Sequence, residues 1–415
     1  MKKWFLVASV LCGGFSAVAQ DIIRGGDISM LTLVEDNGGK YKNTNNQERE
    51  CLSLLTENGM NCARLRLYND PGNPDFDPSN RLPAGYQNEE DVLRLARRAK
   101  EAGMQILLTF HYSDYWTNGE TQTKPHDWAE LSFLLLRRAV RRYTSDFLTK
   151  MKEQGTLPEY VSIGNETQSG MLYPDGSHEN MTQLCQLYGA ASAGVRDVSK
   201  DIKVIVHLAG GGDATLYRWH FGELKKNNVD YDIIGASYYP FWTEKTIEEI
   251  SDWATVINQE FNKSVLLMEV GYAWRKTLPD GSNGQLYDNG PYTSMTPTGQ
   301  KDFMEQLFNT ILANDALIGL VYWDPIFIPA GDAGWELGGK NVVANSTLFS
   351  FYGKAQPALA TFKTGLPDAV RDVKNEDVSC ELSSNVVYDL SGRKIAHPSS
   401  PKGVYIINGQ KRVDK

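Results

Sequence analysis

From residue 21 onward, short runs of apolar and β-branched residues alternate with longer amphipathic segments. This alternation is typical of a parallel sheet covered by helices, because such strands are buried on both faces while each helix buries one face. The alternation predicts eight β-strands, near residues 22–30, 62–68, 104–111, 160–165, 203–209, 231–238, 264–270 and 317–323. Eight units in roughly 340 residues match a (β/α)8 barrel, a TIM barrel of the α/β class, with long loops.

A doubly wound sheet is the competing architecture for this pattern. Such a sheet normally carries a glycine-rich phosphate-binding turn with G-x-G-x-x-G spacing after its first strand. The corresponding segment here, Arg24-Gly25-Gly26-Asp27, lacks that spacing. The barrel is therefore the favoured prediction.

Some helices and loops are predicted by their end signals. Asn88 is a candidate N-cap before an acidic first turn and an apolar stripe, and Gly103 is expected to end that helix. A second, long helix is predicted over residues 128–152, ended by Gly155. Residues 70–87 contain four prolines and are expected to form a long loop after the second strand, on the active face of a barrel.

Residues 1–19 have the pattern of a secretory signal peptide. A basic start is followed by a short apolar run and by Ala17-Val18-Ala19, so the mature chain is expected to begin at Gln20 and to be extracytoplasmic, whether periplasmic, at the cell surface or secreted. Lipidation at Cys12 is the alternative. No stretch approaches the roughly 20 apolar residues that a membrane span requires.

The chain is expected to divide into a barrel domain over residues 20–366, a charged linker over 367–378 and a small β tail over 379–415. Within the tail, Val386-Val387-Tyr388 and residues 403–407 predict β-hairpins. The tail resembles the C-terminal tails associated with type IX secretion, and is expected to lie apart from the catalytic site.

Composition narrows the function classes. The chain has 415 residues, 41% of them hydrophobic, and Lys+Arg 42 against Asp+Glu 51 give a net charge of -9. Without a basic stripe, nucleic acid is excluded as a partner. The four cysteines beyond Cys12 are too sparse for a disulfide framework and lack metal-type spacing, so no role is assigned to Cys51, Cys62, Cys185 and Cys380. We expect a monomer.

Two glutamates stand out because each ends an otherwise apolar predicted strand. Glu166 follows the fourth strand and Glu269 lies at the end of the seventh. In a barrel both strand ends point to the same face. A pair of carboxylates on either side of a glycosidic bond suffices for its hydrolysis, without a metal or cofactor, and a separation of about 5–5.5 Å gives retention of configuration.

Several ordered motifs resemble one known family. They are Gly25-Gly26-Asp27-Ile28-Ser29-Met30, Ala63-Arg64-Leu65-Arg66-Leu67, Phe110-His111-Tyr112-Ser113-Asp114-Tyr115-Trp116, Gln122-Thr123-Lys124-Pro125, Gly164-Asn165-Glu166, Ile234-Gly235-Ala236-Ser237-Tyr238-Tyr239-Pro240-Phe241-Trp242 and Tyr322-Trp323. Over nearly all of residues 22–365 the chain resembles the endo-β-1,4-galactanases of glycoside hydrolase family 53, which are retaining (β/α)8 enzymes. The resemblance implies hydrolysis of internal β-1,4-galactosidic bonds in galactan or type I arabinogalactan side chains of pectin.

Carried over by position, the resemblance makes Glu166 the acid/base and Glu269 the nucleophile. It also assigns Asn165 to the 2-hydroxyl of the sugar. Arg66, at the end of the second strand, is expected to hold the nucleophile ionised through a charge-assisted hydrogen bond. Tyr238, which closes the sixth strand, is expected to bond the nucleophile or the sugar.

Further substrate contacts are expected around the mouth of the barrel. His111 and Asp114 lie on the loop after the third strand, near the expected position of the bound galactose. Trp116, Trp242 and Trp323 fall at or beyond strand ends, where flat rings stack on the apolar faces of pyranoses. Trp323 is the candidate floor of the subsite for the cleaved sugar.

A structural calcium ion is a further implication of the resemblance, in the loop after the seventh strand. Asp280 and Asn283 offer the hard oxygen ligands that calcium prefers, and a solvated turn is the alternative. The chain departs from the family at Gly26, at Met30 and in the glycine-rich end of the fifth strand, so the far subsites are left open.

Two other classes of function were weighed. A non-catalytic polysaccharide-binding protein would use the aromatic residues alone, and the carboxylate pair argues against it. A metal-dependent barrel hydrolase needs a convergent ligand set, whereas only His111 and His207 end predicted strands. Product length, endo against processive action and tolerance of arabinose branches are not fixed by the sequence.

Overall fold

The computed structural model divides into two compact units, residues 1–371 and 372–415, which are described separately. The described residues are 22–74, 81–366, 387–388, 403–407 and 410–414. The predicted signal peptide and the predicted linker lie outside them, so both stay predictions.

The first unit is built on eight parallel strands that close into a barrel, in the order β1-β12-β11-β10-β9-β6-β5-β4. Their bounds are β1 (Ile23–Asp27), β4 (Cys62–Leu67), β5 (Gln105–Phe110), β6 (Tyr160–Ile163), β9 (Lys203–Leu208), β10 (Ile233–Tyr238), β11 (Val265–Val270) and β12 (Leu317–Tyr322). Each lies within or near its predicted range, and the (β/α)8 prediction is confirmed. Because all of these strands run in parallel, their C-terminal ends meet at one mouth.

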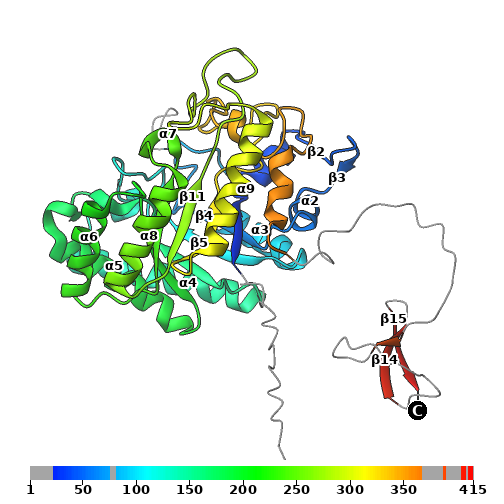
Figure 1. Ribbon diagram of the computed structural model, residues 1–415. Coiled ribbons are helices and arrows are strands. Elements are labelled where there is room, and N and C mark those ends of the chain that lie inside the picture. Colours follow the sequence, from blue (N-terminus) through cyan, green and yellow to red (C-terminus); the bar gives the residue numbers. More distant parts are fainter. Residues whose placement is uncertain (1–21, 75–80, 367–386, 389–402, 408–409, 415) are drawn as a thin grey trace, which may run out of the picture. The chain divides into compact units, whose positions relative to one another are not determined.

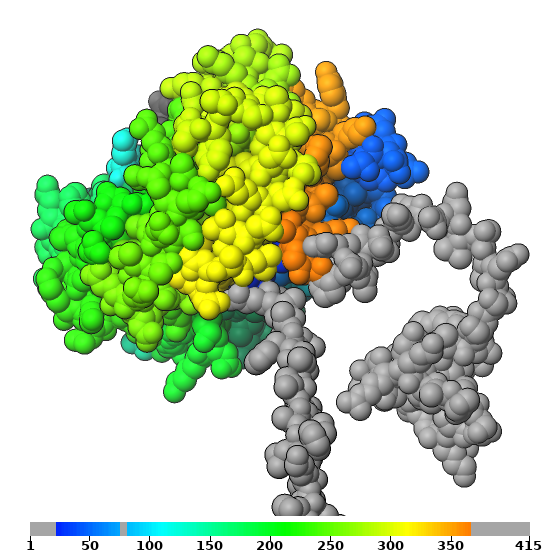
Figure 2. Space-filling view, in the orientation of Figure 1, coloured from blue at the N-terminus to red at the C-terminus, as the bar shows by residue number. Residues whose placement is uncertain are grey.

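Helices surround the strands, as Figure 1 shows. Their bounds are α1 (Leu31–Asp36), α2 (Cys51–Glu57), α3 (Glu89–Glu101), α4 (Phe133–Gln154), α5 (Met181–Val198), α6 (Ala214–Lys226), α7 (Pro240–Thr243), α8 (Ile247–Phe261) and α9 (Pro297–Ala313). Short 3-10 segments are η2 (His126–Trp128), η3 (Thr167–Ser169), η4 (His178–Asn180), η5 (Ala344–Ser346) and η6 (Pro357–Lys363). In the space-filling view α9 lies between α8 and the segment that contains η6 (Figure 2).

The capping residues predict the bounds of α3 correctly, whereas α4 begins later than predicted. Asn88 caps α3 by accepting a hydrogen bond from the backbone N–H of Asp91, and Gly103 follows the helix at φ +80°. The predicted helix over 128–152 begins later, at Phe133, because the chain first forms η2 and a turn before Ser132. Gly155 ends it in the left-handed conformation, at φ +81°.

Short strands complete the described structure. β2 (Tyr41–Lys42) pairs with β3 (Glu48–Arg49), and β7 (Gly170–Met171) pairs with β8 (Gly176–Ser177). Two-residue strands have no hydrophobic period, so the sequence pattern missed them. In the second unit, β13 (Val387–Tyr388), β14 (Gly403–Ile407) and β15 (Gln410–Asp414) form an antiparallel sheet, as the tail pattern predicted. No helix within the described ranges is long and apolar enough to cross a membrane.

Candidate active site

A cavity of about 160 Å³ opens at the C-terminal mouth of the barrel. Both candidate glutamates line it, together with Arg66, His111, Trp116, Thr117, Asn118, Asn165, Tyr239, Trp242, Gln285, Trp323 and Trp335. These residues come from strand ends and from the loops that follow them. The barrel therefore gathers in one cavity residues that are far apart in the sequence, such as Trp116 and Trp335, which are 219 positions apart.

Glu166 lies in the tight turn that follows β6. Its backbone has a φ of +49°, in the left-handed region, and directly precedes η3. The hydroxyl of Ser237 donates a hydrogen bond to its Oε1 over 2.6 Å. Burial, followed by the negative charge of Glu269, raises the pKa of Glu166 to about 8, although Ser237 and Arg64 act in the opposite direction. Glu166 is thus suited to hold a proton near neutral pH.

Two side chains donate hydrogen bonds to the carboxylate of Glu269. Arg64 Nη1 donates to its Oε1 over 2.7 Å, and the hydroxyl of Tyr239 donates to its Oε2 over 2.8 Å. The Arg64 side chain is fully buried and that of Glu269 is 9% exposed. Hydrogen bonds to both oxygens fix the orientation of the carboxylate. The two glutamates therefore lie in one cavity with different hydrogen-bond partners.

The arginine that holds Glu269 is Arg64, and the prediction of Arg66 was wrong. Both side chains point into the barrel, because residues two apart on a strand share a face. Arg66 instead lies 3.3 Å from Asp27 and 3.5 Å from Asp324, and its guanidinium stacks 4.6 Å from the ring of Trp116. Arg66 still lines the cavity, as an aromatic-stacked cation.

The prediction for Tyr238 was also wrong, by one position. Its hydroxyl donates to the backbone oxygen of Lys245 over 2.9 Å, and its ring packs on Phe303 outside the barrel. Ser237 and Tyr239 point inward instead, since side chains alternate along a strand. Tyr239 thus makes the hydrogen bond to Glu269 that was expected of Tyr238.

This alternation supports a paired test with phenylalanine. We expect Tyr239→Phe to lower kcat by about 10- to 100-fold, because one hydrogen bond to a charged group contributes roughly 1.5–3 kcal/mol. The matched variant Tyr238→Phe should keep kcat within about twofold. Steady-state kinetics of both variants are the measurement, and equal losses of kcat would contradict the assignment.

Asn165 and His111 both line the cavity, where the sequence placed them. Asn165 accepts a bond from Arg64 Nη2 over 2.6 Å and donates to the backbone oxygen of Thr117 over 2.9 Å. His111 Nδ1 lies 2.7 Å from the Thr117 hydroxyl, and burial lowers the pKa of His111 well below its usual range. Both side chains are thereby fixed before substrate binds, and their sugar contacts stay predictions.

Asp114 does not line the cavity, in contrast to its prediction. Its carboxylate accepts bonds from the backbone N–H groups of Asp70 and His126, each over 2.8 Å. Both carboxylate oxygens of Asp114 thus pair with backbone amides of two loops. These amides would otherwise be left without a partner, which is costly in a folded loop. Asp114 therefore shapes the rim instead of facing the sugar.

The three predicted tryptophans all line the cavity. Trp116 stacks on Trp335 with ring centroids 4.3 Å apart, and Trp335 meets Trp323 edge to face at 5.0 Å. Trp242 is 50% exposed, whereas Trp323 is only 6% exposed. The cavity thus has a firm aromatic wall and one exposed ring at its edge, which suits stacking on sugar rings.

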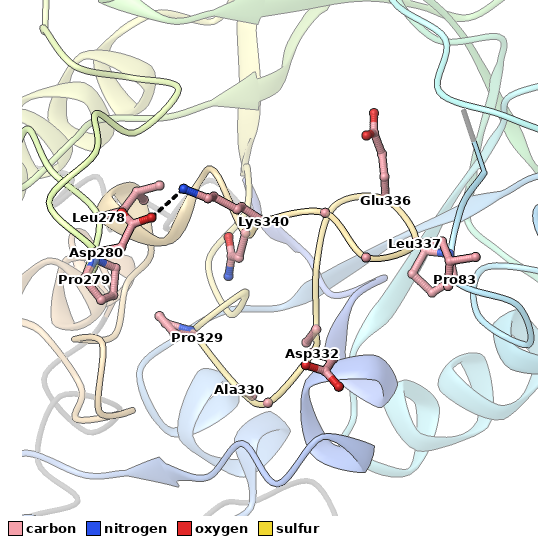
Figure 3. A pocket seen from close by; sticks show the side chains of 15 residues that line it. Pro83, Leu278, Pro279, Asp280, Pro329, Ala330, Asp332, Glu336, Leu337 and Lys340 are labelled. Carbon is pink, nitrogen blue, oxygen red and sulfur yellow. Dashed lines mark hydrogen bonds and ion pairs between the residues drawn. The ribbon is translucent and has the colours of Figure 1, made fainter. Parts of the chain in front are cut away.

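The predicted calcium ligands do not fit a calcium site. Asp280 Oδ1 accepts from the backbone and the hydroxyl of Ser282, and Asp280 Oδ2 is paired with the ammonium of Lys340 over 2.5 Å. Figure 3 shows this ion pair across a second hollow, formed by the loops after β11 and β12. Asn283 pairs through its backbone with Thr277. The lysine already supplies the positive charge that a cation would bring to this loop.

Comparison with models of protein families decides which family this chain belongs to. The model of glycosyl hydrolase family 53 matches residues 23–362. The chain belongs to glycosyl hydrolase family 53. It is therefore a glycoside hydrolase, and the family assignment made from its motifs is confirmed.

Individual members of family 53 agree with this assignment. An endo-beta-1,4-galactanase of Bacillus subtilis is 30% identical, over 83% of this chain and 86% of its own length. An arabinogalactan endo-beta-1,4-galactanase of Thermothelomyces thermophilus is 30% identical, over 82% of this chain and 98% of its own. The solved family 53 catalytic domain of Ignisphaera aggregans superposes with a TM-score of 0.79 at 35% identity, over 84% of this chain and 97% of that one.

Sequence reasoning missed three residues of this family 53 site. Arg64 and Tyr239 donate hydrogen bonds to Glu269, and Ser237 donates one to Glu166. The alternation of β10 could have indicated that Ser237 and Tyr239 share a face, whereas the last residue of the strand was taken instead. Nothing in the one-dimensional pattern separates Arg64 from Arg66, since both lie on the inward face.

Proposed function

We propose that this enzyme hydrolyses internal β-1,4-galactosidic bonds of galactan and type I arabinogalactan with retention of configuration. One observation carries the proposal: Glu166 and Glu269 line a single cavity, in which burial and the charge of Glu269 raise the pKa of Glu166 while Arg64 donates a hydrogen bond to Glu269. A proton donor and a second carboxyl group in one cavity form the arrangement that glycosidases require, and retention is the course that the resemblance to family 53 implies. The galactan specificity is supported by the names of the family 53 relatives.

In the first step, the carboxylate of Glu269 attacks the anomeric carbon while Glu166 donates its proton to the glycosidic oxygen. The bond between the anomeric carbon and that oxygen breaks, the shortened chain leaves as an alcohol, and a glycosyl ester forms on Glu269. Arg64 and Tyr239 hold both carboxylate oxygens in place before the attack. Little reorganisation is then needed at the moment of reaction.

In the second step, Glu166 acts as a base. It takes a proton from a water molecule, whose oxygen bonds to the anomeric carbon as the ester to Glu269 breaks. Two displacements on one centre restore the original configuration. Because the first step returns Glu166 to its ionised form, the same residue serves both steps.

Early products from linear galactan test this proposal. We expect a spread of intermediate galacto-oligosaccharides when short incubations are resolved by size, and a β-anomeric product in proton NMR recorded within the first minutes. β-1,4-Mannan and β-1,4-xylan serve as control substrates, from which no comparable release is expected. Release of a single small product, or an α-anomeric product, would overturn the internal or the retaining part of the proposal.

The pH dependence follows from the state of Glu166. The proton that it donates is present below its pKa, about 8, and is lost as the pH rises through that value. We therefore expect kcat/KM to fall about tenfold per pH unit above that region. In Glu269→Gln the negative charge is gone, so the pKa of Glu166 should fall, as carboxyl carbon NMR would measure. An unchanged pKa in this variant would contradict the coupling.

A further inference from the structure

Behind Glu166 lies a buried hydrogen-bonded chain that the reaction scheme does not use. The Ser237 hydroxyl donates to Glu166 Oε1 over 2.6 Å, and His207 Nε2 lies 2.9 Å from that hydroxyl. His207 is completely buried and Ser237 is 2% exposed. They come from neighbouring strands, because Gly235 of β10 pairs with His207 of β9. The chain is therefore built into the barrel wall.

The direction of this chain follows from the other ring nitrogen. His207 Nδ1 is buried and has no hydrogen-bond partner among the described residues. A buried N–H without a partner is costlier than a buried nitrogen that only accepts, so Nδ1 is expected to carry no proton. The proton then lies on Nε2, because burial and the charge of Arg64 lower the pKa of His207 well below its usual range and keep the ring neutral.

This tautomer of His207 determines the direction of the two remaining hydrogen bonds. His207 Nε2–H donates to the Ser237 oxygen, and the Ser237 O–H must then donate to Glu166 Oε1. An oxygen that accepts this bond is poorly placed to carry the acidic proton, since the serine hydrogen already points at it. The reverse direction would turn the proton of Glu166 toward Ser237 and away from a substrate.

We propose that Ser237, oriented by neutral His207, is a positioning residue that keeps the acidic proton of Glu166 on the oxygen available to the glycosidic bond. The inference rests on the proposed role of Glu166 as the acid/base. The same hydrogen bond remains after Glu166 has lost its proton, so the carboxylate keeps its orientation for the second step. Neither Ser237 nor His207 lines the cavity, and neither acts on the sugar directly.

Substrates that differ in leaving group separate this role from a merely structural one. We expect Ser237→Ala to lower kcat/KM at least tenfold for galactan, whose leaving alcohol needs a proton. For 2,4-dinitrophenyl β-galactobioside, whose leaving group departs without one, kcat/KM should change less than twofold. Ser237→Thr keeps the hydroxyl and should restore at least half of the activity on galactan. Thermal unfolding of each variant controls for the fold.

The histidine provides a second pair of variants. His207→Gln retains an N–H near the position of Nε2 and should keep most activity on galactan, whereas His207→Leu should reproduce the leaving-group dependence of Ser237→Ala. Equal losses on both substrates in Ser237→Ala, or no loss on either, would overturn the proposal.

Glu166→Ala provides the reference for the acid role itself. It should lose activity on galactan but retain kcat/KM on the dinitrophenyl substrate within about tenfold. If Glu166→Ala shows this selectivity and Ser237→Ala does not, the positioning role fails while the proposed function stands. If Glu166→Ala lacks the selectivity, the proposed function itself fails.

Discussion

Replacing Glu269 with alanine is expected to lower kcat on galactan by at least about 10⁴-fold, because the covalent route to the glycosyl ester is removed with the carboxylate. The loss should be chemical in origin, with KM changed only a few fold. Steady-state release of reducing ends measures it. Glu305→Gln, an exposed glutamate on α9, is the control and should keep wild-type activity.

Azide discriminates between a lost nucleophile and a damaged fold. The small anion can enter the space left by the missing carboxylate and attack the anomeric carbon of the dinitrophenyl galactobioside. We expect partial rescue of Glu269→Ala by azide, with an α-galactobiosyl azide as the product. Substantial galactan hydrolysis by Glu269→Ala without azide would show that another group is the nucleophile.

Replacing Arg64 is expected to lower both the stability and the kcat of the enzyme, and this is the second largest effect that we expect. Its guanidinium bonds Glu269 and Asn165, and lies 3.5 Å from Asp27, with the whole side chain buried. Arg64→Met should lower the free energy of unfolding by about 3–5 kcal/mol, since it leaves buried carboxylates without their cation. It should also lower kcat at least about 100-fold, because the nucleophile loses a charge-assisted bond.

Chemical denaturation and steady-state kinetics measure these two effects. Arg64→Lys keeps the charge but not the planar fork of donors, so we expect an intermediate loss of both quantities. Arg141→Lys is the control, because Arg141 pairs with Asp197 at the exposed surface, where such a pair contributes at most about 1 kcal/mol. A stable and fully active Arg64→Met would refute the part assigned to this residue.

The barrel was predictable from the sequence because each of its strands is an apolar run bounded by polar turns. Burial on both faces produces that signal locally, and eight repeats of it allow few architectures. The positions of Glu166 and Glu269 were predictable for the same reason, since a carboxylate at the end of an apolar run is conspicuous. Both line the same cavity at the barrel mouth.

The partners of those carboxylates were not predictable in the same way. Arg64 and Arg66 differ only in depth along one inward face, and depth depends on the stagger of the closed barrel. Asp114 and Asp280 lie in loops, where backbone amides and Lys340 compete for their oxygens. This competition depends on contacts between segments that are distant in the sequence, and a local sequence pattern does not predict such contacts.

The account depends most directly on Glu269 forming a covalent bond to the sugar. In 2-deoxy-2-fluoro-β-galactobiosyl fluoride, the 2-fluoro group slows both steps, whereas the good leaving group keeps the first step fast. Incubation of the enzyme with this compound should therefore accumulate the glycosyl ester. Intact mass spectrometry should then show one added glycosyl unit, and peptide mapping should place it on Glu269. A label on another residue, or complete turnover with inversion and no label, would contradict the assignment.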